Sequence, residues 1–119
     1  MQPSIFKSYD IRALSPGEIE ASDAERIGRA LGSIYKPKRV LVGHDMRTTS
    51  QPLEEALIEG LRSQGADVVR IGLCSTPMFY FAMTEQGESV DLGVMVTASH
   101  NPAEYNGFKM MRGNGLPIG

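Results

Sequence analysis

The sequence has 119 residues, which suits one domain with one modest hydrophobic core. Its hydrophobic content of 41% is ordinary for a soluble protein, and no apolar run approaches the roughly 20 residues that span a bilayer. A formal net charge of -2 disfavours nucleic acid binding, which usually needs a basic face. The N-terminus lacks the charged-then-apolar order of a signal peptide, so we expect a cytoplasmic protein with no membrane partner.

The first half of the chain predicts a strand, a helix and a second strand. The first strand is expected over residues 5–11. Apolar residues at helical spacing predict an amphipathic helix over 23–35, opened by a capping box from Ser22 to Glu25. The short apolar run 40–42 is typical of a strand that is buried on both faces of a sheet.

A second helix is expected over residues 51–64. Ser50 is a plausible N-cap, and Gly65 is placed to end the helix in a left-handed conformation. The apolar stretch 68–73 predicts the next strand. Cys74 follows it and is expected to be a buried small hydrophobic residue; as the single cysteine of the chain, it excludes an intrachain disulfide and a cysteine-based metal cluster.

The remaining elements complete an alternating order of strands and helices. Thr76-Pro77 predicts the start of a third helix that Gly87 closes, and its methionine and aromatic stripe is more typical of core packing than of a ligand site. Strands are expected over 90–96 and 108–111. This order predicts an α/β fold with a mainly parallel, mixed sheet and helices on both faces, a three-layer α/β/α architecture.

Polar segments follow the carboxyl ends of the expected parallel strands, at residues 44–49, 73–76 and 97–106. Ligands of open α/β sheets gather beyond these strand ends. The last segment is the longest and the most polar. Its small residues, Thr97-Ala98-Ser99, let a substrate approach a hydroxyl closely, so Ser99 is a candidate nucleophile or phosphate carrier.

Two nearby side chains are suited to assist Ser99. His100 is adjacent, but neighbouring side chains of an extended backbone point to opposite sides, so adjacency alone does not make a dyad. Lys109 could reach back over the loop as a cation or proton carrier. An ordinary turn ending in Asn101-Pro102, with a structural histidine, explains the same residues equally well. A serine hydrolase is a poorer explanation, because the serine lacks a glycine on either side.

The segment 43–50 is a second candidate site, since it joins a strand to a helix start. Hydroxyls and backbone N–H groups at a helix start favour anions, and Arg47 can pair with a phosphate in bidentate fashion. Alternatively, Arg47 pairs with Asp45 or with the nearby backbone. His44 and Asp45 supply two candidate metal ligands without a third, which is a weak metal signal. Neither a P-loop nor a dinucleotide glycine fingerprint is present.

Four motifs occur in a fixed order along the chain: IFKSYDIR at 5–12, VGHDMR at 42–47, TASHNP at 97–102 and YNGFK at 105–109. This set resembles the N-terminal domain of the α-D-phosphohexomutases, particularly the phosphomannomutase/phosphoglucomutase branch. The resemblance covers almost the whole chain, and a Ser-His-Asn-Pro loop closely followed by Asn-Gly-x-Lys is its most specific part.

The resemblance implies an isomerase that acts as an intramolecular phosphotransferase. In that family the serine that matches Ser99 is phosphorylated and gives its phosphoryl group to a hexose 1- or 6-phosphate. The resulting hexose 1,6-bisphosphate, which is both intermediate and activator, turns over and returns its other phosphate. A phosphoserine carries about -1.5 to -2 charges near neutral pH and therefore needs cations around it. The family uses Mg²⁺, which Ser99 would contact through its phosphate.

The resemblance also assigns roles around that serine. His100 and Lys109 lie by the phosphate, with Lys109 a candidate general acid or base, and Asn101 belongs to the phosphate-binding loop. Tyr9 and Arg12 match the N-terminal motif, and Arg12 contacts the phosphoserine region.

Two further positions match the family less sharply. Arg47 matches a family arginine that is equally suited to bind phosphate or to support the site structurally. Ala13 stands where the family usually has glycine, which alters the turn without weakening the resemblance.

The remaining parts of the family pattern are absent from this sequence. It has no aspartate-rich metal loop, no sugar-recognition loop and no C-terminal phosphate-binding loop. We therefore expect residues 1–119 to be an incomplete N-terminal domain of a multi-domain enzyme, with the remaining domains as partners and hexose phosphates as substrates. The isolated chain is expected to be essentially inactive, and an unpaired sheet edge favours its self-association.

Two alternatives stay open. A phosphoglucosamine mutase domain is the nearer one, and the Phe6–Asp10 start favours the mannose/glucose branch over it. A free-standing phosphosugar-binding module is the other, and it would bind its ligand tightly by itself. The sugar preference would reside in the other domains.

Overall fold

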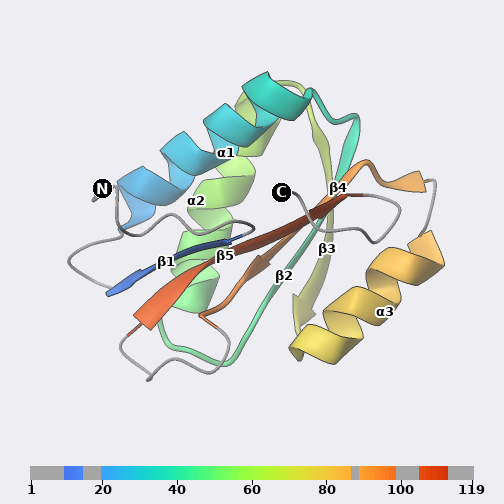
Figure 1. The fold of residues 1–119 in the computed structure, drawn as a ribbon. Helices are drawn as coiled ribbons and strands as arrows, with labels where there is room; N and C mark the ends of the chain where they lie inside the picture. Colours follow the sequence, from blue (N-terminus) through green and yellow to red (C-terminus); the bar gives the residue numbers. More distant parts are fainter. Residues whose placement is uncertain (1–9, 15–19, 87–88, 99–104, 113–119) are drawn as a thin grey trace.

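A five-stranded sheet with helices on both faces forms the protein (Figure 1). The computed structural model describes residues 10–14, 20–86, 89–98 and 105–112. The strands are β1 (Asp10–Leu14), β2 (Arg39–His44), β3 (Asp67–Leu73), β4 (Leu92–Val96) and β5 (Tyr105–Arg112). The helices are α1 (Ala21–Tyr35), α2 (Ser50–Ser63) and α3 (Thr76–Gln86). No helix in these ranges is both long enough and apolar enough to cross a bilayer.

The sheet has the strand order β1-β5-β4-β2-β3 and is mixed. Strands β3, β2 and β4 are parallel, β5 is antiparallel to β4, and β1 is antiparallel to β5. Helices α1 and α2 lie on one face and α3 lies on the other (Figure 1). The predicted three-layer α/β/α architecture is therefore confirmed.

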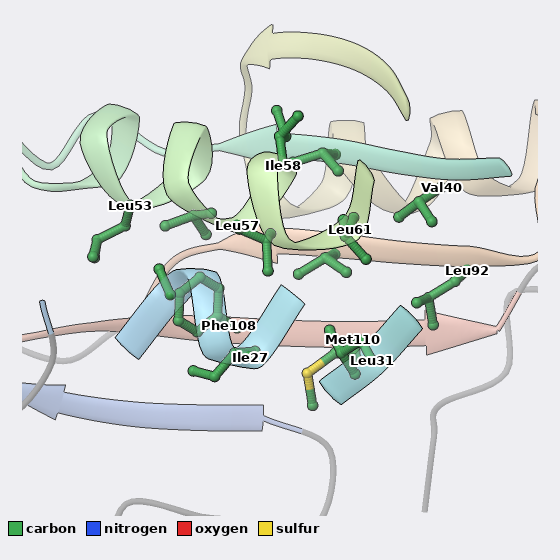
Figure 2. Close-up of a cluster of buried hydrophobic side chains, with 14 of the residues drawn as sticks. Ile27, Leu31, Val40, Leu53, Leu57, Ile58, Leu61, Leu92, Phe108 and Met110 are labelled. Atoms are coloured by element: carbon green, nitrogen blue, oxygen red, sulfur yellow. The ribbon is translucent and has the colours of Figure 1, made fainter. Parts of the chain in front are cut away.

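The alternation of side chains along each strand assigns them to two core clusters. Val40 and Val42 of β2 pack towards α1 and α2, whereas Leu41 between them packs towards α3. On β5, Phe108 faces the first layer and Met111 the second. Figure 2 shows the larger cluster, in which side chains of α1 and α2 meet those of the sheet. All three residues of 40–42 are fully buried, as predicted for a strand covered on both faces.

The two helices of the larger layer touch backbone to backbone. A Cβ atom added at Gly28 of α1 would lie 2.3 Å from the carbonyl oxygen of Leu57, and one added at Gly60 of α2 would lie 2.1 Å from that of Glu25. Real Cβ atoms do not come this close, so each helix requires glycine where it crosses the other. The two glycines let the backbones of α1 and α2 approach more closely than any side chain at these positions would allow.

The start of α1 differs from the prediction, whereas the end of α2 agrees with it. The backbone N–H of Glu20 donates to Asp23 Oδ2 at 3.0 Å, so α1 begins at Ala21 and the predicted box from Ser22 to Glu25 is wrong. The reason is that the Asp23 carboxylate accepts a hydrogen bond from the backbone of Glu20. The N-cap therefore lies two residues before the predicted one, Ser22. Gly65 has a φ of 88° and follows the end of α2, as predicted.

The stripe on α3 is core on one side only. Phe79 and Met83 are fully buried, and Met83 lies against the backbone of Gly93 in β4. Met78 and Phe81, by contrast, are 60% and 66% exposed. The prediction that the whole stripe packs in the core is therefore wrong, because α3 presents only one side to the sheet and no described element covers its other side.

Two predicted features cannot be compared with the structure in full. The first strand overlaps β1 at Asp10 and Ile11, and residues 5–9 lie outside the described residues. Gly87 also lies outside them.

Replacing Gly60 by alanine is expected to destabilise the protein by about 1–3 kcal/mol, because the new methyl group forces α1 and α2 apart. Urea denaturation followed by circular dichroism measures this free energy. The matched control is Glu59→Ala, at the neighbouring exposed position of α2, which should change it by less than about 0.5 kcal/mol. Equal stability of the two variants would show that the helices can separate at no cost.

Candidate functional site

The carboxyl ends of the parallel strands β2, β3 and β4 meet at one edge of the sheet, where a groove of about 570 Å³ opens. The first residues of α3 and a lysine of β5 complete its wall. Its lining residues are Asp45, Met46, Arg47, Cys74, Ser75, Thr76, Pro77, Tyr80, Thr97 and Lys109. All three segments predicted to follow the strand ends therefore contribute to one concave surface.

A buried carboxylate, Asp45, lies at the centre of this edge. Its Oδ1 accepts hydrogen bonds from Ser50 Oγ at 2.5 Å and from the backbone N–H of Arg47 at 3.1 Å. Its Oδ2 accepts one from Thr97 Oγ1 at 2.6 Å and another from Arg47 Nη1. Asp45 thereby joins the end of β2, the start of α2 and the residue that follows β4.

The same network reaches β5 through Asn106. Its side-chain Nδ2 donates to Ser50 Oγ at 2.9 Å and to Thr49 Oγ1 at 2.8 Å, and both Asn106 and Ser50 are fully buried. Ser50 was predicted to cap α2, but it is the first helical residue and its hydroxyl donates to Asp45 instead. That prediction is wrong because the buried carboxylate competes for the hydroxyl.

The backbone fixes Thr97 from two further sides. Its N–H donates to the carbonyl oxygen of Gly107 at 2.9 Å, and the N–H of Asp45 donates to the carbonyl oxygen of Val96 at 3.1 Å. Thr97 and Ala98 are both buried. The chain therefore leaves β4 along a defined path towards residue 99.

Hydrogen bonding, rather than burial, decides the ionisation of Asp45. Burial by itself raises the pKa of the Asp45 carboxyl, but hydrogen bonds from Ser50, Thr97 and the Arg47 backbone, together with the Arg47 charge, outweigh it. The pKa of Asp45 is consequently held below its ordinary value, so the group is a carboxylate near neutral pH.

The two cations that line the groove have different surroundings. Arg47 is buried and pairs with Asp45, the second of the two possibilities that its sequence position left open. Lys109 is half-buried, and its Nζ lies 5.8 Å from the centre of the Tyr80 ring. Because Asp45 compensates Arg47, Lys109 supplies the uncompensated positive charge among the described lining residues.

A second buried carboxylate lies behind the groove. Glu54 of α2 is fully buried, its Oε2 contacts His44 Nδ1, and its Oε1 lies 3.4 Å from Arg70 Nε. His44 is therefore engaged with α2. Cys74 is half-buried rather than fully buried as predicted, and burial, with the nearby Glu54 charge, raises the pKa of its thiol.

The predicted site residues divide into two groups. Arg47 and Lys109 lie on the groove, whereas Ser99, His100, Asn101 and Tyr9 lie outside the described residues. The backbone of Arg12 pairs with Gly107 in the β1–β5 ladder, beside the hydrogen bond that fixes Thr97.

Sequence reasoning missed three residues of this site. Asp45 was considered only as a partner of Arg47 or as a metal ligand, and Asn106 only as part of a motif. Tyr80 was not singled out when the α3 stripe was assigned to core packing. The available signal for Asp45 was its position directly after a buried parallel strand, where polar residues gather at ligand sites.

The described residues do not form a site for a divalent cation. No group of three or more histidine, cysteine, aspartate or glutamate side chains among them could hold a metal ion. The lone pairs of Asp45 already accept four hydrogen bonds, one of them from a guanidinium group. A Mg²⁺ ion bound through a phosphate on Ser99 stays a prediction.

Comparison with known proteins gives consistent results. The family described as phosphoglucomutase/phosphomannomutase, alpha/beta/alpha domain I, matches residues 3–119. A phosphomannomutase of Klebsiella pneumoniae is 49% identical over 98% of this chain and 73% of its own length. One of Escherichia coli is 49% identical over 98% of this chain, which spans 25% of that protein. A crystal structure of a phosphoglucomutase/phosphomannomutase family protein from Burkholderia thailandensis superposes with a TM-score of 0.85 at 40% identity, over 96% of this chain and 27% of its own.

Replacing Asp45 by alanine is expected to destabilise the protein by about 3–5 kcal/mol, because it removes the carboxylate that pairs with the buried Arg47 guanidinium and accepts hydrogen bonds from the Ser50 and Thr97 hydroxyls. Urea denaturation at neutral pH measures the loss. Met46→Ala is the matched control, since Met46 is the next residue and is 76% exposed. A loss below about 1 kcal/mol in the Asp45 variant would contradict a central role for the carboxylate.

The pH dependence of the free energy of unfolding should report on the same carboxylate, Asp45. Because the folded-state pKa of Asp45 is lowered, its contribution to stability is present above the unfolded-state pKa of about 3.9 and is lost as the pH falls through the folded-state value. Asp45→Asn removes this contribution. The free energy of unfolding should therefore fall less between about pH 5 and about pH 2 in this variant than in the wild type, and Met46→Ala should keep the wild-type slope.

Proposed function

Because the chain belongs to the phosphoglucomutase/phosphomannomutase family, as its α/β/α domain I, we propose that it supplies the phosphate-carrying serine of a phosphohexomutase. Ser99 is the carrier. The reaction is the interconversion of a hexose 1-phosphate and a hexose 6-phosphate through a hexose 1,6-bisphosphate. The chain spans about a quarter of the Escherichia coli relative, so the active site of such an enzyme draws on residues beyond those of this chain.

One observation carries this proposal: the buried network around Asp45 fixes Thr97, two residues before Ser99. The Thr97 hydroxyl and backbone N–H are both held, and Ala98 is buried. Phosphoryl transfer depends mainly on positioning and on stabilising charge, since the protein does little covalent chemistry beyond accepting the group. A rigid start to the loop is what a serine that must give and regain a phosphoryl group requires.

The charges of the groove support the same chemistry. Lys109 adds a cation to a wall that also contains the first residues of α3. A phosphoryl group moving from Ser99 Oγ to a sugar hydroxyl breaks one P–O bond and forms another, and the hydroxyl proton needs an acceptor. We propose that Lys109 stabilises the phosphoryl oxygens; general acid/base work by Lys109, with His100 beside the phosphate, is the further prediction from the family resemblance.

Several finer points remain predictions. The other ligands of Mg²⁺ and the residues that select the sugar, glucosamine phosphate included, are expected in further domains. Phosphate contacts by Tyr9, Arg12, Arg47 and Asn101 and a cytoplasmic location also stay predictions.

A chimera tests the function. The matching quarter of the Escherichia coli phosphomannomutase is replaced by this chain, which is 49% identical to it. The chimera should interconvert mannose 1- and 6-phosphate, and Ser99→Ala should reduce its turnover by at least about a thousandfold, as expected for loss of a covalent carrier. Ser63→Ala, an exposed position on α2, is the control and should retain full activity.

Three outcomes would contradict the proposal. Mutase turnover by the isolated chain with a bisphosphate activator would show that the other domains are not needed. Tight hexose phosphate binding by the isolated chain, with neither turnover nor a phosphoserine in the chimera, would favour a free-standing binding module. Labelling of Ser99 by a fluorophosphonate would favour a hydrolase.

The exposed side of α3 suggests where other domains pack. Leu73, Met78 and Phe81 are at least 60% exposed, and with neighbouring apolar residues they line a groove of about 450 Å³. Exposed apolar patches of this kind usually mark interaction surfaces. This groove lies beside β3, whose outer edge is unpaired among the described strands. We propose that in a longer family member another domain covers this surface.

In the isolated chain, the uncovered surface should cause self-association. Sedimentation velocity is expected to show a rise in mean mass with concentration, and Phe81→Lys should suppress it by placing a charge in the patch. Ile34→Lys is the matched control, because Ile34 is 70% exposed but lies on α1, on the other face of the sheet. Suppression by both variants alike would point to net charge rather than to the α3 surface.

A further inference from the structure

Lys109 occupies a position that the sheet would otherwise give to an apolar side chain. Side chains alternate along β5, and Phe108 and Met110 face α1 and α2 while Met111 faces the α3 side. Lys109 shares the α3 side with Met111. Its partner across the ladder is Met95, which is fully buried. A cation therefore emerges next to the second core cluster, with its stem half-buried.

The ammonium group of Lys109 has an aromatic neighbour in the described part of the chain. Its Nζ lies 5.8 Å from the centre of the Tyr80 ring, and on the β1 side of the ladder Lys109 pairs with Asp10. That distance is within the range of a cation–π interaction. A lysine side chain has many accessible rotamers. An aromatic ring beneath the ammonium group therefore reduces the number of positions that this group occupies.

Tyr80 is placed for this role by the helix that carries it. The two neighbours on its inner side, Phe79 and Met83, are fully buried and hold α3 against the sheet. Tyr80 is 38% exposed and lines the same groove as Lys109 and Thr97. The core consequently holds the helix that carries the ring, and the ring itself lines the groove.

We propose that Tyr80 is a positioning residue, which holds the Lys109 ammonium at the wall of the groove where an anionic phosphoryl group is received. The inference rests on the proposed function for the presence of that anion. Tyr80 acts through Lys109. The aromatic face, rather than the phenolic hydroxyl, provides the effect.

The test uses the whole chain, labelled with ¹³C-lysine, and inorganic phosphate as the probe. The chain has four lysines, so the Lys109 ε-CH₂ signal is identified by its loss in Lys109→Arg, and the exposed Lys36 and Lys38 serve as internal references. An aromatic ring beneath this group shifts its signal upfield. The shift should be present in the wild type and in Tyr80→Phe and absent in Tyr80→Leu. Phosphate should move the Lys109 signal with an affinity about two- to fivefold weaker in Tyr80→Leu, and unchanged in Tyr80→Phe.

Each other outcome overturns a stated part. An upfield shift that persists in Tyr80→Leu would refute the contact. Loss of the shift without a change in phosphate affinity would refute positioning by Tyr80 and leave the proposed function intact. A normal ring shift with no response of Lys109 to phosphate in any variant would instead count against a phosphate in this groove, and so against the proposed function and the inference together. Circular dichroism of each variant confirms that it is folded.

Discussion

The Asp45 carboxylate is the interaction on which the functional edge of this protein depends. A buried charge is costly unless hydrogen bonds surround it, and Asp45 receives them from Ser50, Thr97 and Arg47. These donors come from the start of α2, from the end of β4 and from the turn between β2 and α2. Satisfying one carboxylate therefore fixes three chain segments relative to one another.

The two sides of the sheet contribute differently to the site. On one side, α1 and α2 make close backbone contact, and Glu54 ties α2 to His44 and Arg70 of the neighbouring strands. On the other side α3 is the one helix that the described residues form, with an inner row of side chains in the core and an outer row exposed. The groove lies where these sides meet at the strand ends. Its polar floor is thus rigid, and its apolar wall continues into a surface suited to contact with other polypeptide.

The fold was largely predictable from the sequence, because each strand and helix carries a regular apolar pattern. The run 40–42 and Gly65 behave as their local chemistry predicts. The errors have different physical causes. Ser50 gives its hydroxyl to a distant carboxylate instead of capping its helix, whereas the outer row of α3 is apolar without being core. The roles of Asp45 and Tyr80 depend on residues that are far away in sequence, at Thr97 and Lys109, and the position of Asp45 after a buried strand was the local sign of its importance.

The glycine contact between α1 and α2 has a consequence at the other end of α2. Gly28 and Gly60 face each other, and a Cβ at Gly28 would lie 3.1 Å from the Gly60 Cα atom, so the helices can meet this closely in one longitudinal register. Gly60 is ten residues from Ser50, which corresponds to about 15 Å along the helix axis. The crossing point therefore sets how far α2 extends towards the strand ends. It thereby also sets the position along the helix axis at which the Ser50 hydroxyl meets the Asp45 carboxylate.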